Sequence, residues 1–187
     1  VKEPFITISS ADRDFLEKHV APCMEAVTRR RIRVFMDRSA GVYKLRIHDR
    51  MLWEVLVEKY KVPCGAKSRR ITPPVTLTRG EQLSYVRGWF DGEGWIEILR
   101  KRSRNVYEYP RVGFKVQSKA IRNWILDVLR RHGVPSSSYN RADRSYGIWI
   151  NGTVASELFM RHIGFGYAKK NRALRRLVAT CRGRLSA

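Results

Sequence analysis

Thr78-Arg-Gly-Glu-Gln-Leu-Ser-Tyr-Val-Arg-Gly-Trp-Phe-Asp-Gly-Glu-Gly94 is the stretch of the sequence that decides the fold. It predicts a helix, because Thr78 and Glu81 have the spacing of a capping box, in which each side chain satisfies a backbone N–H of the first turn. One side of this helix carries Leu83, Val86 and Phe90, and another carries only the small residues Ser84, Gly88 and Gly92. A glycine inside a helix costs about 1 kcal/mol relative to alanine, so two on one face indicate that another backbone packs closely there.

The end of this helix, Asp91-Gly-Glu-Gly94, places carboxylates where the helix dipole is negative. That arrangement suits a bound cation better than it suits helix stability. The nine residues Val86 to Gly94 resemble the LAGLIDADG signature of homing endonucleases, with identity at Gly88, Asp91 and Gly94. A surface helix with a glycine-rich end is the alternative. The capping box, the small face and the acidic end together argue against it.

The resemblance implies an α+β fold, in which two pseudo-symmetric αββαββα-type repeats form a saddle of β-strands. In this family two signature helices pack through their small residues, and the acidic residue before the last glycine binds a divalent metal ion. That residue is Glu93 here, and the resemblance adds the backbone carbonyl of Gly92 as a ligand, while Asp91 belongs to the packing of the motif. We expect Mg²⁺, because hard oxygen ligands combined with phosphate and water suit this ion.

The composition indicates a folded protein with a polyanionic partner. Of 187 residues, 43% are hydrophobic, which is enough for one compact domain or two small ones. A formal net charge of +21, with five Trp and eight Tyr among the basic residues, favours nucleic acid over a membrane surface. No apolar run reaches the roughly 20 residues of a membrane span, and the N-terminus has no signal-peptide pattern, so we expect an intracellular, cytoplasmic protein. The three cysteines form no C-x-x-C pair, which predicts reduced thiols.

The two halves of the sequence are similar to each other, which indicates an internal repeat. Ile8-Ser-Ser10 resembles Val116-Gln-Ser118, and the segment 42–47 resembles the segment 145–150. Each half is therefore expected to contain a strand, a helix, two strands, a helix and a lysine-bearing loop. The first repeat with its proline-rich connector is expected over residues 1–77, and the second repeat over residues 78–187. The expected strands are 4–9, 31–38, 41–48, 95–100, 106–117, 136–142 and 145–151, and Pro22 is expected to kink the first long helix.

This repeat is asymmetric, because the second half begins with the signature helix and a further strand, whereas the first half begins at Val1 with neither. Two-repeat members of the family carry a signature helix at the start of each half. Either a first motif is missing from this chain, or two copies of the chain pair through Gly88 and Gly92. The expected partner of the signature helix is therefore an upstream segment or a second copy of the chain.

The resemblance also implies a glutamine at the end of a strand and a lysine from a loop beside the metal. Gln117 matches the glutamine, with Ser10 expected at the equivalent place in the first half. Lys67 and either Lys169 or Lys170 match the lysine, although each lysine taken alone is more simply a solvated or phosphate-contacting residue. The four histidines share no spacing that would predict a zinc site.

Basic residues on alternating strands predict the surface that binds DNA, because a two-stranded ribbon with a basic face can enter a major groove. The residues expected there are Arg31, Arg33, Lys44, Arg46, Arg100, Arg102, Arg104, Tyr107, Tyr109, Arg111, Lys115, Arg141 and Arg144.

These features predict a site-specific homing endonuclease, intron- or intein-encoded, that hydrolyses double-stranded DNA at a long target with a divalent metal. An RNA maturase or another non-cleaving nucleic-acid-binding protein on the same scaffold is the alternative. Such a protein would need no carboxylate facing phosphates, so Glu93 favours the nuclease. A ribosome-associated basic protein would explain the charge but not the motif.

Overall fold

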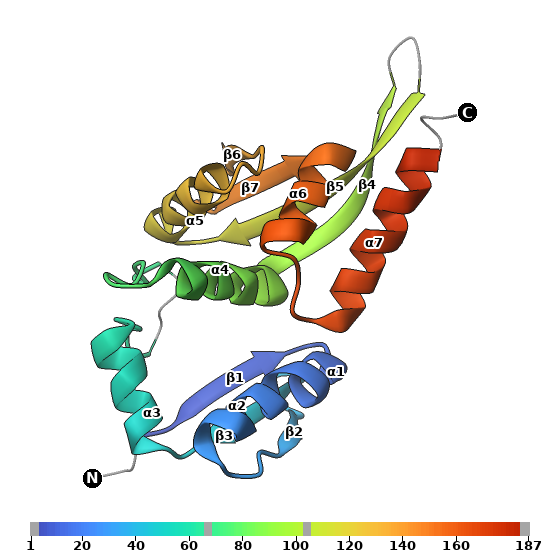
Figure 1. Cartoon of the computed structure of the whole chain (residues 1–187). Coiled ribbons are helices and arrows are strands. Elements are labelled where there is room, and N and C mark those ends of the chain that lie inside the picture. Colours follow the sequence, from blue (N-terminus) through green and yellow to red (C-terminus); the bar gives the residue numbers. More distant parts are fainter. Residues whose placement is uncertain (1–3, 66–68, 103–105, 184–187) are drawn as a thin grey trace. The chain divides into compact units, whose positions relative to one another are not determined.

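The chain consists of two units, Val1–Val62 and Pro63–Ala187, in a computed structural model that describes residues 4–65, 69–102 and 106–183 (Figure 1). The connector groups with the second unit instead of the first. Ile71 is buried in the core of the second unit, and its carbonyl accepts a 2.7 Å hydrogen bond from the hydroxyl of Ser118. The boundary between the units therefore precedes the connector, whereas the sequence placed the connector with the first repeat.

The first unit is a three-stranded antiparallel sheet with helical segments packed against it. Its strands are β1 (Ile6–Ser10), β2 (Val34–Asp37) and β3 (Val42–Ile47), in the order β1-β3-β2. Its helical segments are α1 (Arg13–Phe15), η1 (Leu16–Val20), α2 (Ala21–Thr28), α3 (Arg50–Glu54) and η2 (Val55–Lys59). The predicted alternation in β3 is confirmed, because Leu45 and Ile47 are buried whereas Arg46 is exposed.

Pro22 disturbs the first long helix in a specific way. A proline has no N–H, and its ring collides with the carbonyl four residues earlier, which is that of Lys18. The chain avoids this collision by widening into the π-helical turn η1 and starting α2 anew, with the proline in the first turn. The predicted disruption is therefore confirmed, and it takes the form of a π-helical insertion.

The second unit is a four-stranded antiparallel sheet, in the order β4-β5-β7-β6, with helices covering one of its faces (Figure 1). Its strands are β4 (Gly94–Arg102), β5 (Val106–Val116), β6 (Ser137–Asn140) and β7 (Tyr146–Asn151). Its helices are α4 (Arg79–Glu93), α5 (Lys119–Arg131), α6 (Thr153–His162) and α7 (Ala168–Gly183). No helix in the described ranges is both long and apolar enough to cross a membrane.

The core of the second unit is built around the signature helix. Phe90 of α4 is fully buried, with its ring centroid 5.2 Å from that of Phe114 in β5 and 4.8 Å from that of Phe159 in α6. Val112, Ile148 and Ile150 extend this core along the same face of the sheet. A residue of the motif thus joins a helix, the sheet and a second helix, and its position in the fold is fixed by packing.

The predicted internal repeat is confirmed by the order of the elements and of the strands in the two sheets. The elements β1, α1–α2, β2, β3 and α3 follow the same order as β5, α5, β6, β7 and α6, and the sheet order β1-β3-β2 matches β5-β7-β6. The register corrects one detail. Ser10 pairs with Tyr43 as Val116 pairs with Tyr146, so Ala11, not Ser10, lies at the place equivalent to Gln117.

Candidate active site and nucleic-acid interface

Helix α4 begins with the predicted capping box. The hydroxyl of Thr78 accepts a hydrogen bond from the N–H of Glu81, and the carboxylate of Glu81 accepts one from the N–H of Thr78 at 2.8 Å. The small face of the helix, at Ser84, Gly88 and Gly92, is exposed, and no atom described in the second unit would lie within 4 Å of a Cβ at either glycine. Within its own unit the helix therefore leaves room for a close neighbour on that face.

The C-terminal end of α4 and the N-terminal end of α7 hold each other. Asp91 is only 4% exposed, and its carboxylate accepts hydrogen bonds from the N–H groups of Gly166 at 3.2 Å and Tyr167 at 3.0 Å. In the opposite direction, the ammonium group of Lys170 donates to the carbonyls of Phe90, Asp91 and Gly94 at 3.2, 2.6 and 2.6 Å. Each helix end receives the charge that its dipole favours.

Asp91 therefore has the structural role that the sequence predicted, and Lys170 stabilises the end of the motif without contacting Glu93 in any recorded hydrogen bond. Lys169, the residue before it, has an exposed side chain. Lys67 lies outside the described residues. The catalytic assignment of Lys67 and Lys169 stays a prediction.

Glu93 and Gln117 line one cavity of about 530 Å³. Glu93 is exposed at the last position of α4, and Gln117 is exposed directly after the end of β5. The remaining residues that line the cavity are Ile71, Trp89, Trp95, Lys115 and Val116. The fold thus brings the carboxylate of Glu93 together with an ammonium group and an amide, those of Lys115 and Gln117, which are 22 and 24 positions later in the sequence.

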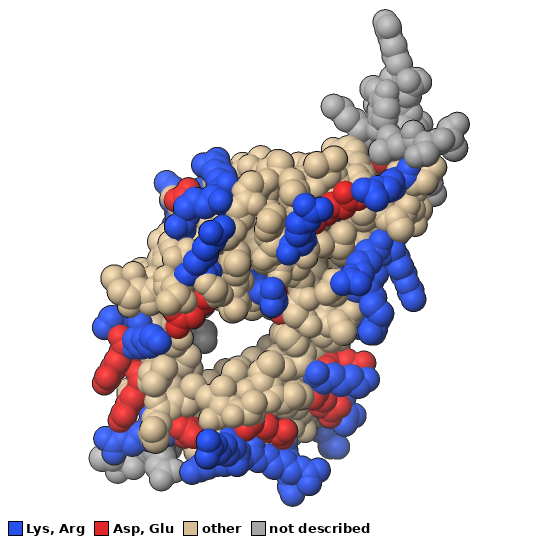
Figure 2. Space-filling model, in the orientation of Figure 1, with Lys and Arg blue, Asp and Glu red and all other residues tan. Residues whose placement is uncertain are grey.

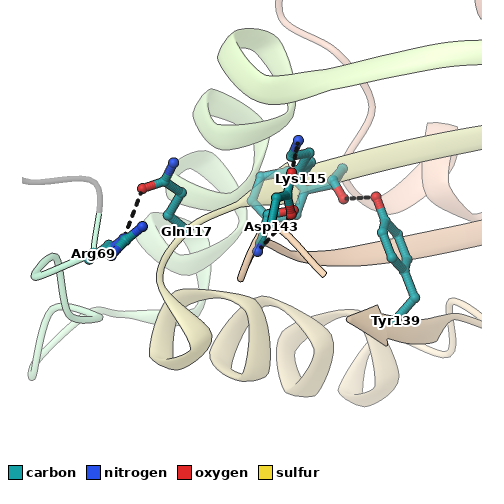
Figure 3. Close-up of polar contacts among 7 residues, drawn as sticks. Arg69, Lys115, Gln117, Tyr139 and Asp143 are labelled. Atoms are coloured by element: carbon teal, nitrogen blue, oxygen red, sulfur yellow. Dashed lines mark hydrogen bonds and ion pairs between the residues drawn. The ribbon is translucent and has the colours of Figure 1, made fainter. Parts of the chain in front are cut away.

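Arg69 is a residue of this site that the sequence did not single out. Its Nε donates a 3.4 Å hydrogen bond to the side-chain oxygen of Gln117, and Figure 3 shows the two side chains meeting from the connector and the end of β5. Ser118 secures both segments, because its hydroxyl oxygen accepts the N–H of Ile121 as the cap of α5 and its O–H donates to the carbonyl of Ile71. Only the hydrogen bond between Arg69 and Gln117 reveals which arginine of the connector contacts a residue of the cavity.

The donor set at the end of α4 fits a shared divalent ion. In the part of the chain that the structure describes, no three His, Cys, Asp or Glu side chains are grouped to hold a metal. Asp91 is engaged by backbone amides, so the carboxylate of Glu93 and the carbonyl of Gly92 are the oxygen donors of this end of the helix. Mg²⁺ typically uses one or two carboxylates and completes its shell with water and substrate phosphates. This end of α4 therefore fits an ion bound jointly with a phosphate or a further carboxylate, not a closed protein site.

Comparisons with known proteins agree with the motif and the fold. The chain is 26% identical over 176 residues to homing endonuclease I-ApeI of Aeropyrum pernix, which covers 90% of this chain and 75% of that protein. A structure of variants of the homing endonuclease I-DmoI superposes with a TM-score of 0.58 at 14% identity, covering 85% of this chain and 79% of that one. The chain is thus similar to LAGLIDADG homing endonucleases in its motif, in its sequence and in its fold. No family model matches it.

The fold is also shared with the full-length DUF199/WhiA protein, which has a TM-score of 0.57 and 11% identity and covers 94% of this chain and 52% of that one. The similarity to homing endonucleases thus rests on the motif and on the relationship to I-ApeI, and the fold alone does not specify an activity.

The sheet of the second unit has one face that the described helices of this unit do not cover (Figure 1), and an aromatic layer lies on that face. The ring of Trp149 stacks on that of Tyr139 at a centroid distance of 4.4 Å and meets Trp95 edge-on at 5.3 Å. Gly113 and Gly147 lie beneath these rings, and a Cβ at Gly113 would come within 2.7 Å of the Trp149 ring. The glycines allow the rings to lie against the backbone of β5 and β7.

Arg111 is fixed at the edge of this aromatic layer. Its guanidinium lies 4.3 Å from the centroid of Trp149, and its Nε donates a 2.7 Å hydrogen bond to the side chain of Asn151. A second nitrogen is 3.4 Å from a carboxylate oxygen of Glu97, and the arginine side chain is 17% exposed. The predicted face is confirmed, because Tyr109, Arg111 and Lys115 alternate with the buried Val112, Phe114 and Val116.

Two of the basic residues expected to contact DNA are each held by an aspartate in a turn. Lys44 pairs with Asp37, and Lys115 pairs with Asp143 at 3.0 Å (Figure 3). Hydrogen bonds from Lys44 and then Ser39 hold the pKa of Asp37 well below its usual range. Hydrogen bonds from Ser145 and then Lys115 do the same to the pKa of Asp143. Both aspartates therefore stay ionised at neutral pH and fix the orientation of the lysines.

The same three residues, Asp-Arg-Ser, form these turns in both halves, at 37–39 and at 143–145. In each turn one aspartate oxygen accepts the N–H and the O–H of the serine, as in Ser39 with Asp37 and in Ser145 with Asp143. The sequence comparison of the halves missed this repeat. The shared Asp-Arg-Ser turn shows that β2 and β3 are equivalent to β6 and β7. It does so more directly than the sequence patterns from which the repeat was predicted.

The other predicted DNA contacts are distributed over both units. Arg31 and Arg33 precede β2, and both are exposed, as are Arg46 in β3 and Arg141 and Arg144 beside the turn of β6 and β7. Arg100 is opposite Glu108 and pairs with it at 2.6 Å, on the side of the sheet that carries Val112, so it does not share the face of Arg111. Arg104 and the side chains of Arg102 and Tyr107 lie outside the described part of the structure.

Proposed function

We propose that this protein is a site-specific endonuclease that hydrolyses both strands of a double-stranded DNA target with the help of divalent metal ions. The observation that carries the proposal is Glu93, an exposed carboxylate at the end of the signature helix that shares a cavity with Gln117. A protein that only bound nucleic acid would gain nothing from a negative charge there, because it would repel phosphates.

The relatives support the proposal. I-ApeI is named a homing endonuclease, and structures of I-DmoI hold its target DNA in the presence of Mg or Mn, or DNA with Ca. The formal net charge of +21 gives this chain the electrostatic complement of a duplex.

The residues of the cavity suit phosphodiester hydrolysis. Glu93 and the carbonyl of Gly92 would hold a divalent ion, preferably Mg²⁺, which when bound neutralises charge on the phosphate and lowers the pKa of a bound water. The amide of Gln117, oriented by Arg69, can hydrogen-bond a water or a phosphate oxygen at the same cavity. Lys115 adds positive charge at its wall, while the contributions of Lys67 and Lys169 remain part of the proposal.

A second signature helix would complete the site. One carboxylate serves one metal position, and cutting two strands requires a second set of ligands. The exposed face of Ser84, Gly88 and Gly92 is where such a helix would pack, whether it comes from another segment or from a second copy of the chain.

Replacing Glu93 by glutamine tests the proposal, because the amide keeps the shape of the side chain but binds a divalent ion poorly. The substrate is a plasmid that carries the sequence flanking the gene segment for this chain, joined as if the segment were absent. We expect wild-type protein to linearise it with Mg²⁺ and Glu93→Gln to cut about 100- to 1000-fold more slowly while binding the plasmid as before.

Asp127→Asn is the matched control, since Asp127 is an exposed carboxylate on α5 and away from the cavity. It should cut like wild type. Undiminished cutting by Glu93→Gln would refute the assignment, and tight binding without any metal-dependent cutting by wild type would favour a maturase or a non-cleaving binding protein.

A further inference from the structure

Helix α7 carries a large, unbalanced positive charge. From Leu158 to Ala187 the sequence has eight Lys and Arg and no Asp or Glu. Within α7, Leu174, Val178 and Cys181 are buried, and Lys169, Arg172 and Arg176 are exposed. At 100° per residue these three cations form a row on the side of the helix opposite its buried residues.

In the helical segments of the first unit, three exposed cations are paired with carboxylates of the same segment. There Arg13, Lys18 and Arg50 each pair with a carboxylate one helical turn away, as in Arg13 with Glu17 at 2.8 Å. In α7 the exposed Arg172 is instead followed by two further exposed arginines, Arg175 and Arg176, at spacings of three and four residues. Like charges at these spacings each cost a few tenths of a kcal/mol, so the row opposes helix stability.

A groove beside α7 extends this positive surface. It has a volume of about 680 Å³, lies between α6 and α7, and contains one carboxylate, that of Glu157. Arg161, Arg175 and Arg182 line it, and Arg182 pairs with Glu157 at 2.7 Å. Figure 2 shows Lys and Arg side chains gathered over α7 on the face of the molecule that the helices cover.

This surface and the aromatic face of the sheet are on opposite sides of the second unit. Leu174 and Val178 join the core with Val112 and Phe114, which point to one side of β5, whereas Arg111 and Lys115 point to the other. A duplex that contacts Arg111 would be separated from Arg172 by the sheet and the core. The exposed arginines of α7 therefore lie on the other side of the sheet from Arg111 and Lys115.

We propose that the α6–α7 surface binds a second nucleic-acid strand through its phosphates, at the same time as the sheet face binds DNA. The proposal does not depend on DNA cleavage. Arginine is suited to phosphates because its fork of N–H groups can bind two oxygens at once. The basic stretch 169–182 is about 20 Å long at the rise of a helix, enough for several phosphates. A membrane is a poorer fit, because the apolar side of α7 is packed on the sheet and cannot insert into lipid.

The test uses the full-length chain and the triple variant Arg172→Gln/Arg175→Gln/Arg176→Gln. Two labelled probes, a short RNA hairpin and a short DNA duplex, are each too small to hold two proteins. Native mass spectrometry at saturating probe is expected to show two probes on wild type and one on the variant. For the second, weaker binding event, the slope of the logarithm of the association constant against the logarithm of the salt concentration should be smaller in the variant than in wild type by about 2 to 3. Comparing the RNA probe with the DNA probe shows which backbone this surface prefers.

The control Arg29→Gln/Arg79→Gln/Arg130→Gln removes the same charge from exposed positions outside α7 and should retain two probes. Glu93→Gln should also retain two, so a failure of the nuclease proposal would leave this result unchanged. A wild-type stoichiometry of one, equal losses in both triple variants, or α7-dependent binding to anionic lipid vesicles but not to either probe would overturn the proposal. Circular dichroism of the α7 variant verifies that its helix content is intact.

Discussion

Lys170 supplies the positive charge that the last turn of the signature helix lacks. Helix α4 has no basic residue in its last turn, and its terminal carbonyls would remain unsatisfied beside a buried aspartate. The ammonium group of Lys170 donates to three carbonyls at once. In the opposite direction, the carboxylate of Asp91 accepts a hydrogen bond from the N–H of Tyr167, directly before α7. Because hydrogen bonds to charged groups contribute more than neutral ones, this exchange is a major anchor of the motif.

Removing the charge of Lys170 should therefore weaken the fold, whereas the same change at its neighbour should not. We expect Lys170→Met to lower the free energy of unfolding by about 2 to 3 kcal/mol, as measured by urea denaturation, because carbonyls at a partly buried helix end lose a charged donor. Lys169→Met should change it by less than about 0.5 kcal/mol, since that side chain is exposed. Equal effects of the two substitutions would contradict the assigned role of Lys170.

Lys169 and Lys170 also show that a residue pattern can predict which segment lies near the motif but not which of two adjacent side chains contacts it. The sequence placed Glu93, Gln117 and a lysine of the pair 169–170 near one another by their order relative to the motif. Adjacent residues on a helix differ by 100° in direction, so the choice between Lys169 and Lys170 depends on where α7 begins and how it approaches α4. The approach is set by the contact of Asp91 with Gly166 and Tyr167, which connects residues 75 and 76 positions apart.

Strands β5 and β7 owe their close cover of aromatic rings to glycines. Periodicity predicted which face of β5 would be exposed, but it did not predict that the rings of Trp95, Trp149 and Tyr139 would pack together over that face. Such an arrangement requires the register that sets Gly113 between Trp95 and Trp149. Cross-strand register follows from the turns and from the burial of the opposite face, neither of which a single strand encodes.

We expect Gly113→Ala to destabilise the protein by about 1 to 3 kcal/mol, because the added methyl group would overlap the rings of Trp95 and Trp149. Thermal unfolding followed by tryptophan fluorescence measures both the stability and the change in ring packing. Gly80→Ala is the matched control, since no described atom lies within 4 Å of its Cβ position and it is in the first turn of α4. It should leave stability unchanged or raise it by up to about 1 kcal/mol. A neutral Gly113→Ala would show that the aromatic layer can shift without cost.

At the scale of the whole molecule, the two-fold repeat was predicted from one pair of matching tripeptides and one pair of matching six-residue segments, and it is visible in both sheets. The physical reason is that strand, helix and turn patterns are local, so they persist in sequence even where side chains have diverged. Two features were missed because they depend on tertiary contacts. The connector packs with the second unit through Ile71. The place equivalent to Gln117 is Ala11, because the strand register makes Ser10 equivalent to Val116, two residues from the match of Ile8 with Val116.

The small face of α4 gives a prediction for assembly. A leucine at Gly88 should not destabilise the chain by itself, because the position is exposed and glycine is a poor helix former. It should, however, prevent another backbone from packing there, so we expect Gly88→Leu to abolish double-strand cutting while DNA binding by the basic surfaces is retained.

Sedimentation of wild type and Gly88→Leu, with and without DNA, measures whether the neighbour is a second copy of the chain. A wild-type complex with two chains that falls to one in the variant would identify a homodimer. If Gly88→Leu cuts DNA as wild type does, no helix packs on this face during catalysis.

The mutual capping of α4 and α7 has a consequence for protein engineering. The nine residues of the motif look portable, since they form one continuous segment with the proposed metal ligand Glu93 near its end. Their aspartate, however, is bound by amides at 166 and 167, and their last carbonyls by the side chain at 170. A chimera that receives the signature helix alone would carry a buried, unpaired carboxylate into its host. The smallest transferable module is therefore discontinuous: α4 has to travel together with the loop and first turn of α7.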